Sequence, residues 1–127
     1  MSIQELGTIM EQQAPVKVVL LNNNWLGNVR QWQQLFFGSR YSFTRLANPD
    51  FMTLASAYGI KHRRVEARAE LDEAVAEMLA DPSEPYLLEV HVEEQDNVFP
   101  MIPPGKGVTD IMLNATSWYE YEPLAKR

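Results

Sequence analysis

Residues 16–27 read VKVVLLNNNWLG. The first half is a nearly continuous apolar run, and such runs are typical of strands that are covered on both faces in a parallel sheet. The second half is a polar turn that ends at Gly27. Because ligands of open α/β sheets bind outside the carboxyl ends of the strands, this turn is where we expect the functional site.

Predicted helices alternate with predicted strands along the rest of the chain. Asp50 is placed to cap a helix that Gly59 closes. We also predict strands over residues 60–65 and 86–92, helices over residues 29–36 and 70–80, and a short helix near residues 109–113. This alternation indicates an α/β fold of three layers, in which a mostly parallel sheet has helices on both faces.

Side-chain spacing gives two further expectations about the helices. Ser2 and Glu5 form a capping-box sequence for a helix that the pair Ala14-Pro15 breaks. The helix over residues 29–36 carries an apolar stripe, which predicts its buried face. The stripe consists of Val29, Trp32, Leu35 and Phe36.

Composition and charge exclude several classes of protein. With 127 residues the chain makes one domain, which we place over residues 1–113, followed by a tail over residues 114–127. The net charge of −6 argues against binding to nucleic acid. No apolar run approaches the ~20 residues that span a bilayer, and no secretory signal is visible, so we expect a cytoplasmic domain without a membrane segment. Without cysteine, disulfides and thiolate metal sites are excluded.

Residues 22–24, three consecutive asparagines, allow two interpretations. The simpler one is a turn whose side chains cap the next helix, since asparagine tolerates left-handed turn geometry. The other is a magnesium-diphosphate site, because amide and backbone carbonyl oxygens suit magnesium and the next helix directs its amino terminus toward an anion. Residue types alone leave both open.

Residues 18–33 read VVLLNNNWLGNVRQWQ, and this run resembles the thiamine-diphosphate motif of acetolactate synthase catalytic subunits. The likeness covers about residues 2–113. It continues through RYS at 40–42, NPDF at 48–51, LLEV at 87–90 and PMIPPG at 100–105. The asparagine pair is shared by many thiamine-diphosphate enzymes, whereas VRQWQ at 29–33 is typical of this subfamily.

The resemblance assigns cofactor-binding roles to five residues of the run. Asn23 matches the asparagine whose side chain binds the magnesium of the cofactor diphosphate. Trp25 matches the position whose backbone carbonyl completes that coordination. Leu26, Gly27 and Asn28 match the loop that passes along the cofactor. Asn28 departs from the family, in which methionine is commoner, and an amide there alters the contacts of the pocket.

Two further residues are assigned to the substrate pocket. The resemblance implies that Val29 lines the active-site cavity. It also implies that Trp32 shapes the pocket for the second substrate and favours 2-ketobutyrate over pyruvate. From spacing alone, Trp32 is equally an aromatic residue on the buried stripe of a helix.

The implied activity is condensation of pyruvate with a second 2-oxo acid, pyruvate or 2-ketobutyrate, with loss of CO2 in branched-chain amino-acid synthesis. The implied cofactors are thiamine diphosphate and Mg2+, with FAD on a middle domain. The implied partners are the other domains of the catalytic subunit, a second catalytic subunit and a regulatory subunit. None of the residues here is assigned a catalytic role.

The family motif opens with a Gly-Asp-Gly element, which by spacing would lie just upstream of Ser2. We therefore expect a chain truncated after that element, which binds no cofactor appreciably and is inactive alone. Two alternatives stay open. The chain belongs to another thiamine-diphosphate decarboxylase or carboligase, or it is a non-catalytic truncated module that acts through association.

Overall fold

The computed structural model describes residues 3–115. The chain divides into two compact units. Of the described residues, unit 1 contains those up to Asn24 together with Ala47–Glu93, and unit 2 contains Trp25–Leu46 together with those from Glu94 onward. Ser2 of the predicted capping box and residues 116–127 of the predicted tail lie outside the described residues.

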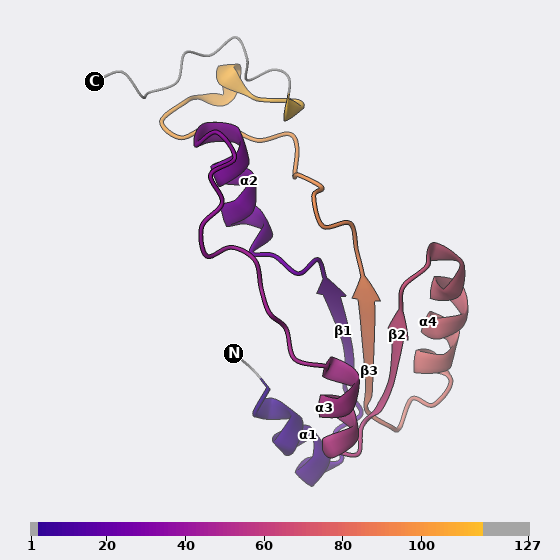
Figure 1. The fold of residues 1–127 in the computed structure, drawn as a ribbon. Helices are drawn as coiled ribbons and strands as arrows, with labels where there is room; N and C mark the ends of the chain where they lie inside the picture. The colour runs from indigo at the N-terminus through magenta and orange to yellow at the C-terminus, as the bar shows by residue number, and fades with distance from the viewer. Residues whose placement is uncertain (1–2, 116–127) are drawn as a thin grey trace. The chain divides into compact units, whose positions relative to one another are not determined.

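Unit 1 is built on a 3-stranded parallel sheet with the strand order β1-β3-β2. The strands are β1 (Lys17–Asn22), β2 (Lys61–Val65) and β3 (Tyr86–His91), shown in Figure 1. Their bounds lie within one residue of the predicted strands. The predicted parallel sheet is confirmed.

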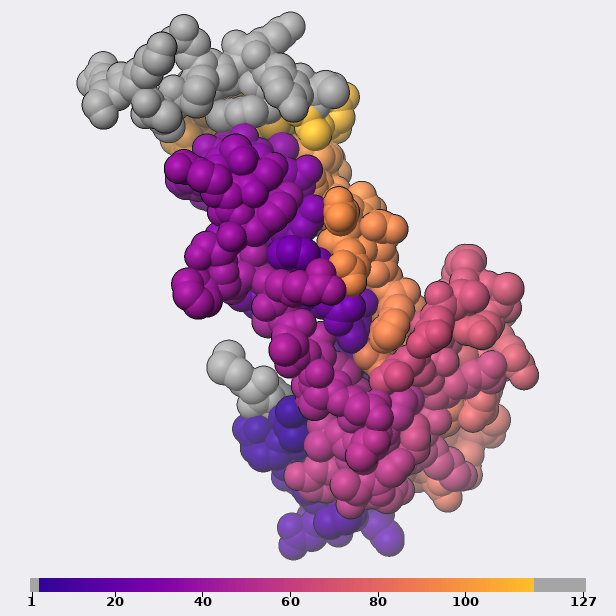
Figure 2. Space-filling view, in the orientation of Figure 1, coloured from indigo at the N-terminus to yellow at the C-terminus, as the bar shows by residue number. Residues whose placement is uncertain are grey.

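Helices cover both faces of this sheet. The helices α1 (Glu5–Gln12) and α3 (Phe51–Ala57) lie on one face, and α4 (Leu71–Leu79) lies on the other (Figure 1). A 3-10 turn at Arg68–Glu70 leads into α4. Figure 2 shows that α3, β2 and α4, in magenta and pink, supply much of the visible surface of unit 1. The predicted three-layer α/β fold is confirmed.

The hydrophobic core lies on the two faces of β3. Successive side chains of a strand point to opposite faces, so Leu88 packs against α4 while Leu87 packs against α1 and α3. The buried residues of the α4 side are Val65, Ala74, Met78, Tyr86 and Leu88, and those of the other side are Leu6, Ala55, Ile60 and Leu87.

β1 does not have the environment that its apolar run predicts. It lies at the edge of the sheet, with Val19 51% exposed and Leu21 66% exposed. Both side chains lie on the face that α4 covers elsewhere, because Val19 pairs in register with Leu88 and Leu21 with Val90. The prediction that both faces of this strand are covered is wrong for the part of the chain described. Apolar composition permits burial, but it does not determine which strand lies beneath the covering helix.

Unit 2 contains α2 (Gly27–Phe36), the loop that follows it and the extended segment after Glu94. The buried residues of α2 are Arg30, Gln31 and Leu35, whereas Val29 and Trp32 are exposed. The predicted buried stripe is therefore wrong for Val29 and Trp32.

Polar contacts explain this rotation of the buried face of α2. The Gln31 side chain donates to the backbone carbonyl of Val98 and accepts from its N–H, both at 2.9 Å. The Arg30 guanidinium lies 5.3 Å from the ring centroids of both Trp25 and Tyr41. A pattern of apolar residues cannot reveal a helix face that is buried by such contacts.

The two ends of the described chain differ from the predictions. The N-cap of α1 is Gln4, which makes no side-chain cap. The short helix predicted near residues 109–113 is confirmed only in part: a 3-10 helix covers Val108–Asp110, and Met112 then forms backbone hydrogen bonds with Met101 at 2.8 and 3.0 Å. Within residues 3–115, no helix is long and apolar enough to cross a membrane.

Candidate functional site

The carboxyl end of β1 in unit 1 leads into a hydrogen-bonded turn. Asn22 is buried, and its Oδ1 accepts from the backbone N–H of Asn24 at 3.0 Å and from Nδ2 of Asn48 at 2.9 Å. The same Asn48 nitrogen donates to Oδ1 of Asn24 at 3.2 Å. Asn24 has φ 58°, a left-handed conformation that asparagine tolerates. Asn23 is half-buried at the centre of this turn.

A buried carboxylate supports the turn from the neighbouring strand. Glu89 on β3 is 1% exposed. Its Oε1 accepts from Nδ2 of Asn22 at 2.8 Å and lies 3.2 Å from Nε2 of His91, while its Oε2 accepts from Nε of Arg64 at 2.7 Å. Burial raises the pKa of Glu89, but the hydrogen bonds from Arg64 and Asn22 outweigh it, so the pKa lies below its ordinary value. Glu89 is therefore ionised in the interior.

The same arginine connects this carboxylate to α3. Nη2 of Arg64 donates to Oδ1 of Asp50 at 2.8 Å. The predicted cap is confirmed, since Asp50 also accepts from the backbone N–H of Met52 at 3.2 Å. The hydrogen bond from Thr53, followed by those from Met52 and Arg64, holds the pKa of Asp50 below its ordinary value. A continuous polar network thus runs from the end of β1 to the start of α3.

Sequence reasoning misses Glu89 and Arg64. In the sequence, Arg64 groups with Lys61 and Arg63 as a solvated basic face, and Glu89 is only part of a strand. In the structure the three cations of β2 are paired with carboxylates of unit 1. A glutamate in a predicted strand that is otherwise mostly apolar is the one available signal, because such a charge needs a buried partner.

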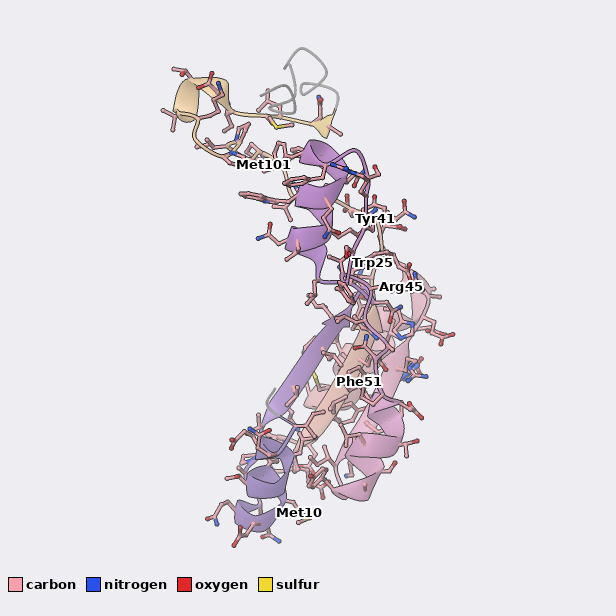
Figure 3. The ribbon with its side chains drawn as sticks, turned by 60° about the vertical axis from the view of Figure 1, so that its left-hand side comes forward. Met10, Trp25, Tyr41, Arg45, Phe51 and Met101 are labelled. Carbon is pink, nitrogen blue, oxygen red and sulfur yellow. The ribbon has the colours of Figure 1, made fainter. Side chains whose placement is uncertain are left out.

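Unit 2 begins at Trp25, which Figure 3 labels together with Tyr41 and Arg45. Its Nε1 donates to Oε2 of Glu94 at 3.3 Å, and its ring centroid lies 5.6 Å from that of Tyr41. The guanidinium groups of Arg30 and Arg45 each lie 5.3 Å from the centroid of the Trp25 ring. These contacts fix the Trp25 side chain within unit 2.

The next two residues start α2. The backbone N–H of Leu26 donates to the carbonyl of Thr44 at 2.8 Å, and Gly27 is the first helical residue. Leu26 occupies the N-cap position, where its apolar side chain cannot accept a hydrogen bond from the first turn. The amides of that turn therefore have no side-chain cap from the N-cap residue.

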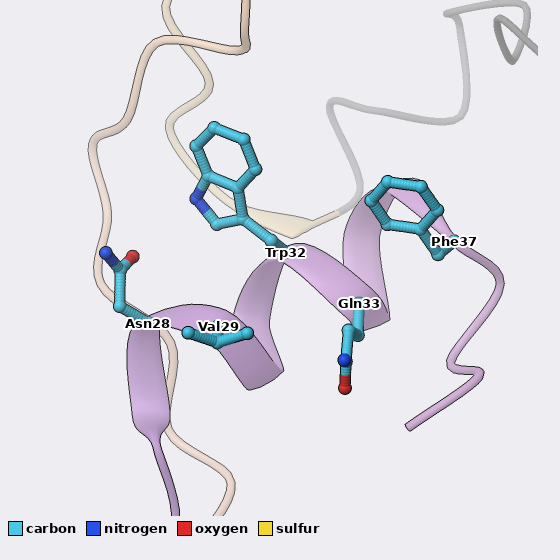
Figure 4. A pocket seen from close by; sticks show the side chains of 5 residues that line it. All are labelled: Asn28, Val29, Trp32, Gln33 and Phe37. Carbon is cyan, nitrogen blue, oxygen red and sulfur yellow. The ribbon is translucent and has the colours of Figure 1, made fainter. Parts of the chain in front are cut away.

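An open pocket of about 300 Å³ lies along α2 (Figure 4). It is lined by Asn28, Val29, Trp32, Gln33 and Phe37. The structure thus brings together three residues that the resemblance assigns to the cofactor loop and to the substrate pocket. Phe37 and Gln33 were not predicted, although Phe37 follows Val29 and Gln33 at helical spacing, which is the signal that could have found it.

Gln33 is held in place from outside the pocket. Its Oε1 accepts from the backbone N–H of Ser42 and from the hydroxyl of Thr44, each at 3.1 Å, and its Nε2 donates to the carbonyl of Ser42 at 3.0 Å. These bonds tie α2 to the loop that follows it in unit 2.

The described residues contain no group of three or more His, Cys, Asp or Glu side chains that could hold a metal ion. Asn23 and its neighbours after β1 offer amide and carbonyl oxygens as candidate ligands for a metal ion. Oxygen ligands of this kind suit magnesium rather than zinc or copper.

Comparison with known proteins places these features in a family. Residues 1–90 match the model of the thiamine pyrophosphate enzyme, C-terminal TPP binding domain. The chain is also similar to a solved structure, the benzoylformate decarboxylase from Polynucleobacter necessarius, with a TM-score of 0.67 and 24% sequence identity over 77% of this chain and 18% of that one. At that identity the likeness shows the fold alone.

Several curated relatives are much longer than this chain. The acetolactate synthase isozyme 2 large subunit of Escherichia coli (strain K12) is 48% identical over 113 residues, which are 88% of this chain and 20% of that protein. The acetolactate synthase large subunit of Pyropia yezoensis is 46% identical over 84% of this chain and 18% of its own length. The mitochondrial acetolactate synthase of Schizosaccharomyces pombe is 42% identical over 90% of this chain and 17% of its own length. The chain spans about a fifth of the length of these relatives.

Proposed function

The chain belongs to the thiamine pyrophosphate enzymes, as their C-terminal TPP binding domain, and we propose that it is this domain of an acetolactate synthase catalytic subunit. The reaction is condensation of pyruvate with a second 2-oxo acid, pyruvate or 2-ketobutyrate, with loss of CO2. The products are precursors of branched-chain amino acids.

The observation that carries the proposal is the extent of the sequence identity. At 48% over 113 residues, it reaches from the strands of unit 1 into the helix and pocket of unit 2. The fold alone does not choose this reaction, because a benzoylformate decarboxylase shares it. The three relatives named above, at 42–48% identity, are by contrast acetolactate synthases.

Asn23 is the residue we propose for the magnesium of the cofactor diphosphate. Its amide oxygen is a hard, neutral ligand, and the turn around it is fixed by Asn22 and Asn48. The carbonyl of Trp25 is the second proposed ligand, and Leu26, Gly27 and Asn28 are the proposed cofactor loop, all by resemblance. When bound, thiamine diphosphate supplies the carbon nucleophile and the electron sink that decarboxylation of a 2-oxo acid needs.

The pocket on α2 is the proposed site for the second substrate. Val29 and Trp32 present apolar surface beside Phe37, which suits the alkyl end of a 2-oxo acid. Asn28 adds an amide at the position where the family commonly has methionine. FAD, a second catalytic subunit and a regulatory subunit belong to the proposal as partners of the longer protein.

The test is a chimera in which this chain replaces the matching residues of the Escherichia coli relative. We expect it to form acetolactate from pyruvate in the presence of magnesium and thiamine diphosphate. A folded chimera that binds the cofactor and releases only acetaldehyde would contradict the proposal and favour a simple decarboxylase.

Two variants of the chimera test the assigned residues. Asn23→Ala should weaken magnesium-dependent cofactor binding at least about tenfold, the scale seen when groups at a metal site are removed. Trp32→Leu should lower the ratio of 2-ketobutyrate to pyruvate used as second substrate, with cofactor affinity unchanged. Equal ratios for the wild-type chimera and Trp32→Leu would mean that Trp32 does not select the second substrate.

A further inference from the structure

We propose that Glu89 is the positioning residue of the cofactor site. Acting through the side-chain amide of Asn22, its carboxylate fixes the turn that carries Asn23. The inference rests on the proposed function for the role of Asn23, and it adds how that residue is held in place. All of the residues involved belong to unit 1.

The first step is that Glu89 determines which way the Asn22 amide points. An ionised carboxylate only accepts hydrogen bonds, and an amide presents an acceptor on one side and donors on the other. Oε1 of Glu89 lies 2.8 Å from the Asn22 amide, so that amide must direct Nδ2 toward it. The permanently charged Arg64 donates to Oε2 at 2.7 Å and keeps the second oxygen occupied.

The second step is that this orientation makes the turn. With Nδ2 directed to Glu89, Oδ1 of Asn22 faces the opposite way and accepts from the Asn24 N–H at 3.0 Å and from Asn48 at 2.9 Å. Hydrogen bonding from a side chain to the backbone two residues on closes an Asx turn, whose central residue is Asn23. If the amide were reversed, its NH2 group would face two other donors, and the turn would lose both bonds.

The cost of burying Glu89 supports a directional role. Replacing a buried ion pair with apolar side chains is often neutral or stabilising, so such a pair is weak evidence for a stabilising role. Glu89 is 1% exposed in the second half of the central strand, within hydrogen-bonding distance of Asn22 at the start of the turn. A leucine would satisfy the packing there, but it would not orient the Asn22 amide.

The experiment compares Glu89→Gln, Asn22→Asp and the double variant in the full chain. In Glu89→Gln, Arg64 donates to the oxygen of the introduced glutamine. The NH2 group of that glutamine then faces Asn22 and forces the Asn22 amide into the reversed orientation. In Asn22→Asp, two carboxylates face each other. In the double variant, the introduced glutamine donates to one oxygen of the introduced aspartate. The other oxygen of that aspartate again accepts from Asn24, with the same total charge as in the wild type.

The first readout is amide hydrogen exchange by NMR. We expect exchange of the Asn24 amide to become about tenfold faster in Glu89→Gln, the scale of one lost hydrogen bond, and to return to the wild-type rate in the double variant. The amides of Leu88 and Val90 report whether β3 stays folded. Unchanged Asn24 exchange in a folded Glu89→Gln protein overturns the proposal.

Should Glu89→Gln fail to fold, the double variant decides: recovery of the fold with a protected Asn24 amide supports the proposal, and failure to recover overturns it.

The second readout is affinity for magnesium thiamine diphosphate in the chimera described above. The positioning role is supported if Glu89→Gln binds the cofactor more weakly and the double variant restores the affinity. Equal affinity of the wild type and Glu89→Gln overturns it. A wild-type chimera that binds no cofactor refutes the proposed function, and the exchange rates then decide alone whether Glu89 sets the turn.

Discussion

At the scale of single residues, the position of a leucine in the sheet determines its contribution to stability. Leu88 and Leu21 both lie on the α4 face of the sheet, but Leu88 is 1% exposed on the central strand and Leu21 is 66% exposed on the edge strand. We expect Leu88→Ala to lower the free energy of unfolding by about 2–5 kcal/mol, because it removes buried contacts and leaves a cavity. Urea unfolding followed by circular dichroism measures the loss.

Leu21→Ala is the matched control, with the same atoms removed from the same face. It should change the free energy of unfolding by less than about 0.5 kcal/mol, as is usual for surface substitutions. At protein concentrations where the chain is monomeric, equal losses for the two variants would mean that β1 is covered within the chain, and the description of β1 as an exposed edge strand would then be wrong.

At the scale of elements, Glu77 ties α4 to the sheet in a pH-dependent way. Its carboxylate accepts from Nη1 of Arg63 at 2.9 Å and from the hydroxyl of Tyr86 at 2.8 Å. The hydrogen bond from Arg63, followed by that from Tyr86, lowers the pKa of Glu77 below 4.5. Because the pKa is depressed in the folded state, the stabilisation is fully present above about pH 4.5 and is lost as the pH falls through the folded value.

Glu77→Gln should therefore be less stable than the wild type at pH 7, and the difference should narrow as the pH falls below the ordinary carboxyl range. The difference in the free energy of unfolding at pH 7 should stay below about 1 kcal/mol, because half of the Glu77 side chain is exposed and solvent screens its ion pair with Arg63. Urea unfolding at several pH values measures it. Glu11→Gln on α1, an exposed carboxylate without an ion pair among residues 3–115, controls for charge; a gap that is independent of pH would refute the assignment.

The same elements show how far sequence alone reaches. The strands, the Asp50 cap and the three layers of the fold were predictable, because each depends on local periodicity or on one capping residue. The central position of β3 and the edge position of β1 were not, because strand order depends on pairings between residues that are distant in the sequence, such as Lys17 with Tyr86. Glu89 was missed for the same reason: its partners Asn22 and Arg64 come from two other strands.

The candidate site was likewise predictable only in part. The resemblance identified Asn28, Val29 and Trp32, and the structure shows that they line one pocket. It could not show that the side chain of Asn22 accepts the hydrogen bonds from Asn24 and Asn48 that close the turn. Three identical side chains in a row differ only in the neighbours that the fold gives them.

At the scale of the whole molecule, the exposed edge of the sheet predicts self-association. β1 forms one edge of the sheet among the described residues, and Val19 and Leu21 place exposed apolar side chains along it. Edge strands of this kind are templates for pairing with another chain, and a lysine on such an edge opposes pairing. The net charge of −6 opposes association by repulsion. Added salt screens this repulsion and should therefore strengthen the association.

We therefore expect light scattering to show a molecular mass that rises with protein concentration and with salt, and Leu21→Lys to shift the chain toward the monomer. Leu113→Lys makes the same change at a leucine that is 69% exposed in unit 2, and it should leave the association of the wild type unaltered. Because both variants add the same positive charge, a difference between them is due to the position of the leucine on β1. If the wild-type chain stays monomeric at every concentration, or if both lysines act alike, the edge of β1 does not drive association.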